Sequence, residues 1–133
     1  MKFLDTNIVL RYLTEDDPCK AKRCDELFKK ISSGKETLFT STLVITEVVW
    51  VLEKVYRLTR DQITVCVQKI LNTPHIECAE KDILLTAVGL YELKNIDFID
   101  AYNAILMQTK DIQDIYSYDT HFDLFPALKR IEP

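Results

Sequence analysis

The chain has 133 residues, 47% of them hydrophobic, and a formal net charge of −4 at pH 7. This length suits one domain with a substantial core, and no apolar run approaches the roughly 18 residues that a membrane-spanning helix needs. The acidic balance excludes a protein that holds nucleic acid through its overall charge alone. Action on a polyanion would need a local reversal of charge, for which a bound divalent cation is the usual means. We expect a single domain over residues 1–133.

The N-terminus and the cysteines indicate a cytoplasmic protein. Asp5 interrupts the apolar N-terminal stretch and no small-residue cleavage pattern follows, so a secretory signal peptide is not expected. The four cysteines form no Cys-x-x-Cys pair, and His75 and His121 do not fall at zinc-ligand spacing from them. With only two glycines, glycine-rich phosphate-binding loops are excluded.

Short strands alternate with helices along the chain. The first half is expected to form, in order, a strand over residues 2–5, helices over 6–14 and 16–34, a strand over 37–41 and a helix over 42–56. Asp16 or Asp17 is expected to cap the second helix, which has Pro18 in its first turn and ends at Gly34.

The second half continues this alternation. It is expected to form a helix over 59–73, a strand over 75–79, helices over 80–94 and 97–111, and strands over 112–119 and 128–132. A capping box of Thr59 and Gln62 begins the first of these helices. The pattern predicts the α/β class, with a three-layer α/β/α sandwich around a mostly parallel central sheet. Sites in such folds form at the carboxyl ends of strands, where Asp5 and Asp119 stand.

Among the acidic residues, Glu47 has the sequence neighbours least typical of a solvent-exposed side chain. On a helix, its neighbours three and four positions away are all apolar: Leu43, Val44, Trp50 and Val51. Burial of an unpaired carboxylate is costly. Glu47 is therefore expected to be buried, either in an ion pair with a distant Lys or Arg or at a site that needs its charge.

Four other acids have both a structural and a functional interpretation. Asp5 either caps the helix over 6–14 or lies at the rim of a site, and Asp97 suits the N-cap of the helix over 97–111. Asp100 lies one turn into that helix, where the helix macrodipole also favours an acid. Asp119 ends a strand and can simply form a turn, and His121, which follows it, is interpreted as a loop histidine.

Carboxylates gathered at one end of a sheet would repel each other, and their pKa values would rise. A Mg²⁺ or Mn²⁺ ion relieves this repulsion, because both are hard ions that prefer oxygen ligands. Such an ion can also activate a water for attack on phosphorus and stabilise the leaving oxygen. Thr6, Asn7 and Ser117 are candidates to hold waters and ligands in place around it.

Four short stretches carry a resemblance to a known family: "FLDTNIVLRYL", "ITEVVWVL", "DFIDAYNAIL" and "YSYDTHFD". In this order they resemble the successive motifs of PIN domains, and most closely those of the small VapC-like toxins of toxin–antitoxin pairs. The resemblance covers essentially the whole chain. It implies an α/β/α fold and a Mg²⁺- or Mn²⁺-dependent ribonuclease.

By position, the resemblance implies four catalytic acids, Asp5, Glu47, Asp100 and Asp119. We expect the three aspartates to share the metal and Glu47 to position the attacking water. Asp97 matches a position that is often acidic in the family. Ser117 stands where the family usually has Thr and keeps the hydroxyl.

The resemblance also implies an RNA substrate, a homodimer and an inhibitory antitoxin whose tail offers a basic side chain to the acids. The helices over 6–14 and 42–56 carry more large apolar residues than one sheet face needs, so part of this set is expected to be exposed as an interaction patch. The alternative is that the set closes an intramolecular core in a monomer. It comprises Val9, Leu10, Tyr12, Leu13, Val48, Val49, Val51, Leu52 and Tyr56.

Two other functions remain as alternatives. An aspartyl-phosphate phosphotransferase also has an Asp after its first strand, but it usually has a second acid two residues later, where this chain has Asn7, and a strand-end lysine that is missing here. A PIN-type module that binds RNA or protein without catalysis is the other alternative. Such modules commonly lack one of the acids, whereas all four are present here.

Overall fold

The structure, a computed structural model, describes residues 1–133 and forms two compact units, Met1–Lys81 and Asp82–Pro133. Strands in both units pair in parallel, and helices connect them, which confirms the predicted α/β class. The prediction of one domain over residues 1–133 stays a prediction. No helix of the chain combines the length and the apolar character needed to cross a membrane.

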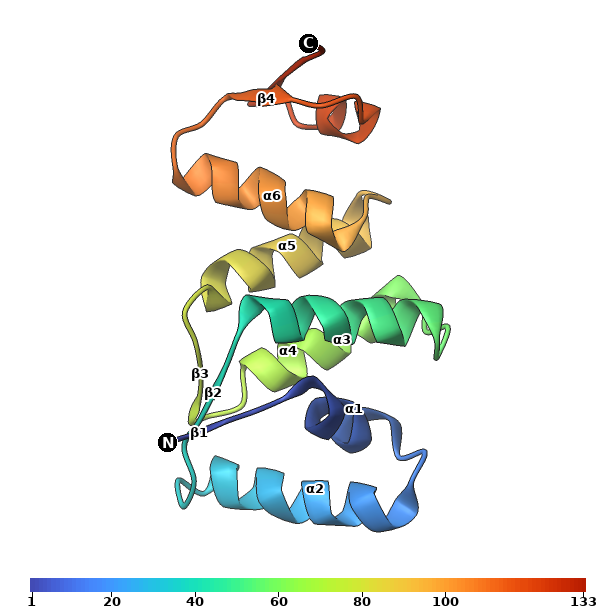
Figure 1. Ribbon diagram of the computed structural model, residues 1–133, viewed down its shortest axis with the longest axis vertical. Helices are drawn as coiled ribbons and strands as arrows, with labels where there is room; N and C mark the ends of the chain where they lie inside the picture. Colours follow the sequence, from blue (N-terminus) through green and yellow to red (C-terminus); the bar gives the residue numbers. More distant parts are fainter. The chain divides into compact units, whose positions relative to one another are not determined.

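The first unit contains a three-stranded parallel sheet in the order β1-β2-β3 (Figure 1). Lys2 of β1 pairs with Leu38 of β2, which in turn pairs with Ile76 of β3. Helix α1 packs on α2 and α3, and α4 packs on α3 and on β3. The elements are β1 (Lys2–Phe3), α1 (Thr6–Thr14), α2 (Pro18–Ser32), β2 (Leu38–Thr40), α3 (Thr42–Lys54), α4 (Arg60–Leu71) and β3 (Ile76–Cys78).

The second unit contains a parallel pair of strands, β4 and β5, in which Asp114 lies opposite Lys129. A short 3₁₀ helix, η1, connects the two strands and packs on α6 and β5. The elements are α5 (Lys81–Leu93), α6 (Phe98–Thr109), β4 (Asp114–Tyr116), η1 (Thr120–Leu124) and β5 (Lys129–Ile131).

The helix ends follow local capping chemistry. Asp17, rather than Asp16, caps α2, because its carboxylate accepts the backbone N–H of Lys20 at 3.1 Å. After α2, Gly34 takes the left-handed conformation with φ 77°, as expected for a residue that ends a helix. Thr59 and Gln62 form both bonds of the predicted capping box at the start of α4.

None of the nine residues expected to contribute to an exposed patch on α1 and α3 is fully exposed. Val9, Val48, Val49 and Leu52 are buried, and the other five residues of the set are only partly exposed. Helices α1 and α3 pack on each other, and the four buried residues belong to the core of the first unit. The apolar residues exposed on α3 are instead Leu43 and Trp50.

Candidate active site

The first unit places Glu47 beside the first turn of α1. The Thr6 hydroxyl donates a hydrogen bond to Glu47 Oε2 at 2.8 Å, and Thr6 itself is buried at 5% exposure. This contact forms because α1 and α3, which begin after the neighbouring strands β1 and β2, pack on each other. Thr6 follows Asp5 directly, so the bond joins the segment that carries Asp5 to the helix that carries Glu47.

The expected burial of Glu47 is wrong, because its side chain is exposed. Two of its four apolar helical neighbours are themselves exposed, Leu43 at 78% and Trp50 at 57%. Apolar neighbours therefore did not predict burial on this face of α3. The bonded partner of Glu47 is the Thr6 hydroxyl rather than a Lys or Arg, which removes the structural ion-pair interpretation.

Asp5 occupies the N-cap position of α1 but makes no capping bond with its side chain. Asp97 does the same at α6. By contrast, Asp17 caps α2 with its carboxylate. Asp5 and Asp97 therefore stand where a capping residue stands, but their carboxylates do not cap the helices and are left for another role. Both side chains are exposed, as is that of Asn7.

This difference predicts unequal effects on stability. Asp17→Ala is expected to lower the free energy of unfolding by about 1 kcal/mol, because it removes a capping bond. Asp5→Ala is expected to lower it by less than half as much, since no such bond is lost. Urea unfolding followed by circular dichroism measures both values. An equal loss in the two variants would show that the Asp5 carboxylate also stabilises its helix.

The second unit brings together Asp100, Asp119 and His121. One ligand atom of each residue lies within 4.8 Å of the others. His121 Nδ1 is 3.1 Å from Asp119 Oδ1 and 4.0 Å from Asp100 Oδ2. Helix α6 carries Asp100, and Asp119 and His121 lie at the start of η1. Because α6 and η1 pack on each other, the three side chains lie close together.

Backbone geometry holds Asp119 in place. Its carboxylate accepts the backbone N–H of His121 at 2.9 Å, which is the N-cap bond of η1. Its own backbone N–H donates to the Ser117 hydroxyl at 3.0 Å. Ser117 thus orients the turn that presents Asp119, as a supporting residue rather than through contact with Asp100.

The two carboxyl groups of this cluster have opposite pKa shifts. Burial raises the pKa of Asp100, and the nearby charge of Asp119 raises it further. The backbone N–H of His121 lowers the pKa of Asp119. Of the two groups, Asp100 therefore takes up a proton first when no cation is near.

This donor set fits a hard divalent cation. Two carboxylates supply the oxygen ligands that Mg²⁺ and Mn²⁺ prefer, and a cation that they held would offset the burial and the charge of Asp119 that raise the pKa of Asp100. From the sequence, His121 was interpreted as a loop histidine and not as a member of the cluster. Its position two residues after Asp119 was the sequence signal that could have placed it in the cluster, because the tight turn of η1 brings His121 back beside Asp119.

The model of the PIN domain family matches residues 2–128 of this sequence. The chain belongs to the PIN domain family. This membership confirms the resemblance of the four motifs and is consistent with the predicted three-layer α/β/α sandwich. The PIN domain is 29% identical over 122 residues to the "VapC ribonuclease" of Aquifex aeolicus (strain VF5), which covers 92% of this chain and 90% of that protein.

A solved structure also aligns with this PIN domain along its length. It is the crystal structure of VapC20 from Mycobacterium tuberculosis, described as a sarcin-ricin loop cleaving toxin. The alignment covers 100% of both chains at 19% sequence identity, with a TM-score of 0.42.

Proposed function

We propose that this PIN domain is a divalent-metal-dependent endoribonuclease and the toxin of a type II toxin–antitoxin pair, acting on RNA in the cytoplasm. The observation that carries the proposal is the close pair of Asp100 and Asp119 beside His121, in a chain of the PIN family. The similarity to a VapC ribonuclease over 92% of the chain supports RNA as the substrate.

Four acids are proposed to be required for cleavage: Asp5 and Glu47 of the first unit, and Asp100 and Asp119 of the second. Asp5, Asp100 and Asp119 would hold Mg²⁺ or Mn²⁺, and Asp97 would support them. When bound, such an ion neutralises charge on the phosphate and lowers the pKa of water. Thr6, Asn7 and Ser117 are proposed to orient the acids and nearby waters.

Glu47 is proposed to orient the attacking water. The Thr6 hydroxyl occupies Oε2 and fixes the carboxylate, so Oε1 stays available to accept a proton from that water. The N–H of His121 fixes the Asp119 carboxylate in a similar way, and the Ser117 hydroxyl, which accepts the backbone N–H of Asp119, holds the turn that carries it. The chain thus supplies charge and proton acceptors on side chains that are already oriented.

The proposal also includes a single domain over residues 1–133, an inhibitory antitoxin and a homodimer. The antitoxin would offer a basic side chain to the acids, because a guanidinium satisfies carboxylates that otherwise hold a cation. Homodimer formation rests on the family resemblance alone, since none of the nine apolar residues that suggested it is fully exposed and four of them are buried.

Expression of this chain without a partner is expected to arrest growth of a bacterial host, because cleaved RNA cannot support protein synthesis. Asp119→Asn is expected to abolish the effect, whereas Asp111→Asn, at an exposed residue outside the cluster, is expected to keep it. Culture density after induction, at protein levels matched by immunoblot, measures this. Unimpaired growth with the unchanged chain would contradict the toxin proposal.

A further inference from the structure

A small hollow between α1 and α2 is lined by six residues, three of which are basic. Its volume is about 310 Å³. Asn7 and Arg11 are four positions apart on α1, and Lys20 and Arg23 are three apart on α2, so each pair lies on one face of its helix. Asn7, Ile8 and Arg11 of α1 and Lys20, Arg23 and Cys24 of α2 line it.

The hollow has a surplus of positive charge in an acidic chain. No carboxylate lines it. Asp16 pairs with Arg11 from outside the hollow at 2.6 Å, and Asp17 lies 3.9 Å from the Lys20 ammonium. Arg23 is exposed and has no acidic partner, and the Arg11 guanidinium keeps donors that Asp16 does not use.

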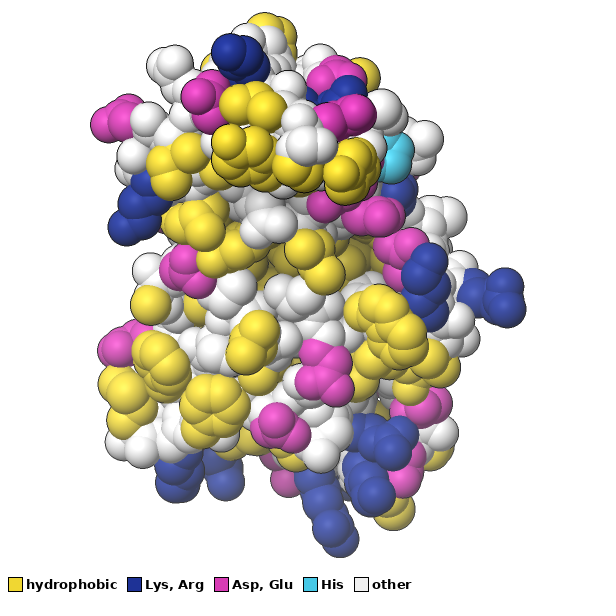
Figure 2. All heavy atoms as spheres, turned by 45° about the horizontal axis from the view of Figure 1, so that its top comes forward, with side chains coloured by type: hydrophobic (Ala, Val, Ile, Leu, Met, Phe, Trp, Pro, Cys, Tyr) yellow, Lys and Arg dark blue, Asp and Glu magenta, His cyan; other side chains and the backbone are white.

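The rest of the lining suits an anion as well. Asn7 adds an amide that can donate hydrogen bonds. Burial raises the pKa of the Cys24 thiol, so this wall carries no negative charge at neutral pH. Helix α2 as a whole carries five of the 17 basic residues, and Figure 2 shows several Lys and Arg side chains gathered at the lower edge of the view.

The hollow also begins beside the proposed catalytic residues of the first unit. Asn7 follows Thr6, whose hydroxyl bonds Glu47. Arg11 lies four residues beyond Asn7, about 6 Å along the helix axis. A group bound in the hollow therefore lies within about one helical turn of Thr6, which donates the hydrogen bond to Glu47.

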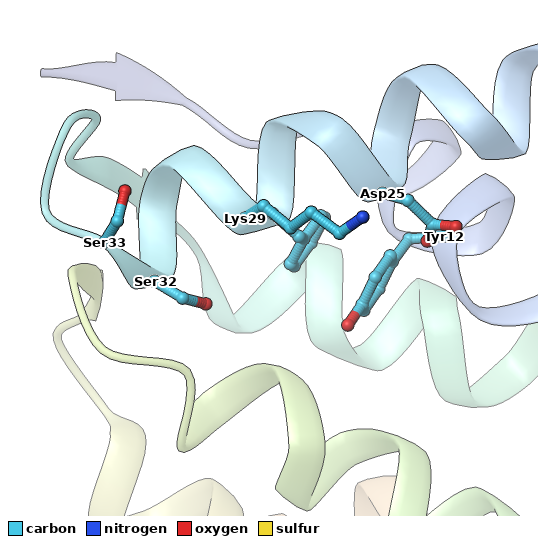
Figure 3. Close-up of a pocket in the computed structure, with 6 residues that line it drawn as sticks. Tyr12, Asp25, Lys29, Ser32 and Ser33 are labelled. Atoms are coloured by element: carbon cyan, nitrogen blue, oxygen red, sulfur yellow. The ribbon is translucent and has the colours of Figure 1, made fainter.

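A second hollow, lined by Tyr12 of α1 and by the C-terminal part of α2, does not share these properties. It has a volume of about 440 Å³ and is lined by one acid, one base, two serines and two aromatic residues (Figure 3). The Tyr12 ring stacks on Phe28 at 3.8 Å, and the Lys69 ammonium lies over Tyr12 at 4.5 Å. Both faces of Tyr12 are thus occupied, so it offers no platform on which a base can stack.

We infer that the hollow of Asn7, Arg11, Lys20 and Arg23 binds a backbone phosphate of the RNA, adjacent to the bond that is cut. This inference rests on the proposed function. Arg11, Lys20 and Arg23 act as positioning residues that set where RNA enters, and they take no part in the chemical step. Backbone phosphates are the group that such contacts recognise without reading sequence.

The test compares Arg23→Gln with Lys22→Gln, a neighbour on the same helix that does not line the hollow. Binding of a fluorescein-labelled single-stranded RNA is measured by anisotropy in excess chelator, over a range of salt concentrations. Arg23→Gln is expected to raise Kd about tenfold at low salt. It is also expected to reduce the slope of log Kd against log salt by about 0.7, the value for one lost phosphate contact.

Steady-state cleavage in Mg²⁺ adds a second readout. Arg23→Gln is expected to raise KM and leave kcat unchanged, and Lys22→Gln to change neither. Equal Kd and salt slope in the two variants would overturn the inference, even if RNA is cleaved. A loss of RNA binding specific to Arg23→Gln, in a chain that cleaves nothing, would support the phosphate site and refute the nuclease.

Discussion

Asp100→Asn is expected to lower the rate of RNA cleavage about a thousandfold or more, because it removes a charge from the proposed cation site. The amide keeps the size of the side chain and its place on α6, so the fold should persist. The rate is measured on a labelled RNA in Mg²⁺. Asp111→Asn, at an exposed residue outside the cluster, is the matched control and should cleave like the unchanged chain.

Asp100→Asn is also expected to change the free energy of unfolding in a definite direction. The pKa of Asp100 is raised in the fold, so its charged form is disfavoured there and costs stability at neutral pH. Asp100→Asn removes that cost when no cation is bound, and its free energy of unfolding in chelator should equal or exceed that of the unchanged chain. Full cleavage by Asp100→Asn would remove Asp100 from the proposed site, and unfolding would give it a structural role.

Glu47→Gln is expected to lower cleavage by about a hundredfold to a thousandfold and to keep the fold. The amide can still accept the Thr6 hydrogen bond, but it cannot take up the proton of an attacking water. The effect should fall on kcat rather than on KM, because Glu47 is proposed to act on the water and not on RNA binding.

Glu77→Gln serves as the control for Glu47, since Glu77 is an exposed glutamate of the same unit on β3. Its cleavage rate should match that of the unchanged chain. If Glu47→Gln unfolds the protein while the remaining soluble fraction keeps full activity, Glu47 is a structural residue. A fall in both variants would point to a general effect of lost negative charge.

The helices were predictable because their signals are local. The helix expected over residues 6–14 spans Thr6–Thr14, and the capping box of Thr59 and Gln62 forms as expected. Apolar spacing and the capping residue lie within one or two turns of each other, so no distant contact is needed to interpret them. The parallel pairing of the strands also followed from the alternation alone.

Exposure and the composition of the acid cluster were less predictable, because they depend on which elements pack together. Glu47 is exposed beside Leu43 and Trp50, although helical spacing favoured burial. His121 joins Asp100 only because η1 packs on α6 and turns tightly after Asp119. The sequence predicted the acids as a group, whereas their partners depend on tertiary packing.

The most direct measurement is cleavage of a circular single-stranded RNA by the purified chain, with Mg²⁺ or Mn²⁺ and with excess EDTA. A circle has no ends, so only an endonuclease converts it to a linear strand. Linear product is expected with either ion, none is expected in EDTA, and cleavage should recover when the ion is restored in excess. A circle that stays intact with both ions, or one that is cut equally well in EDTA, would contradict a metal-dependent endoribonuclease.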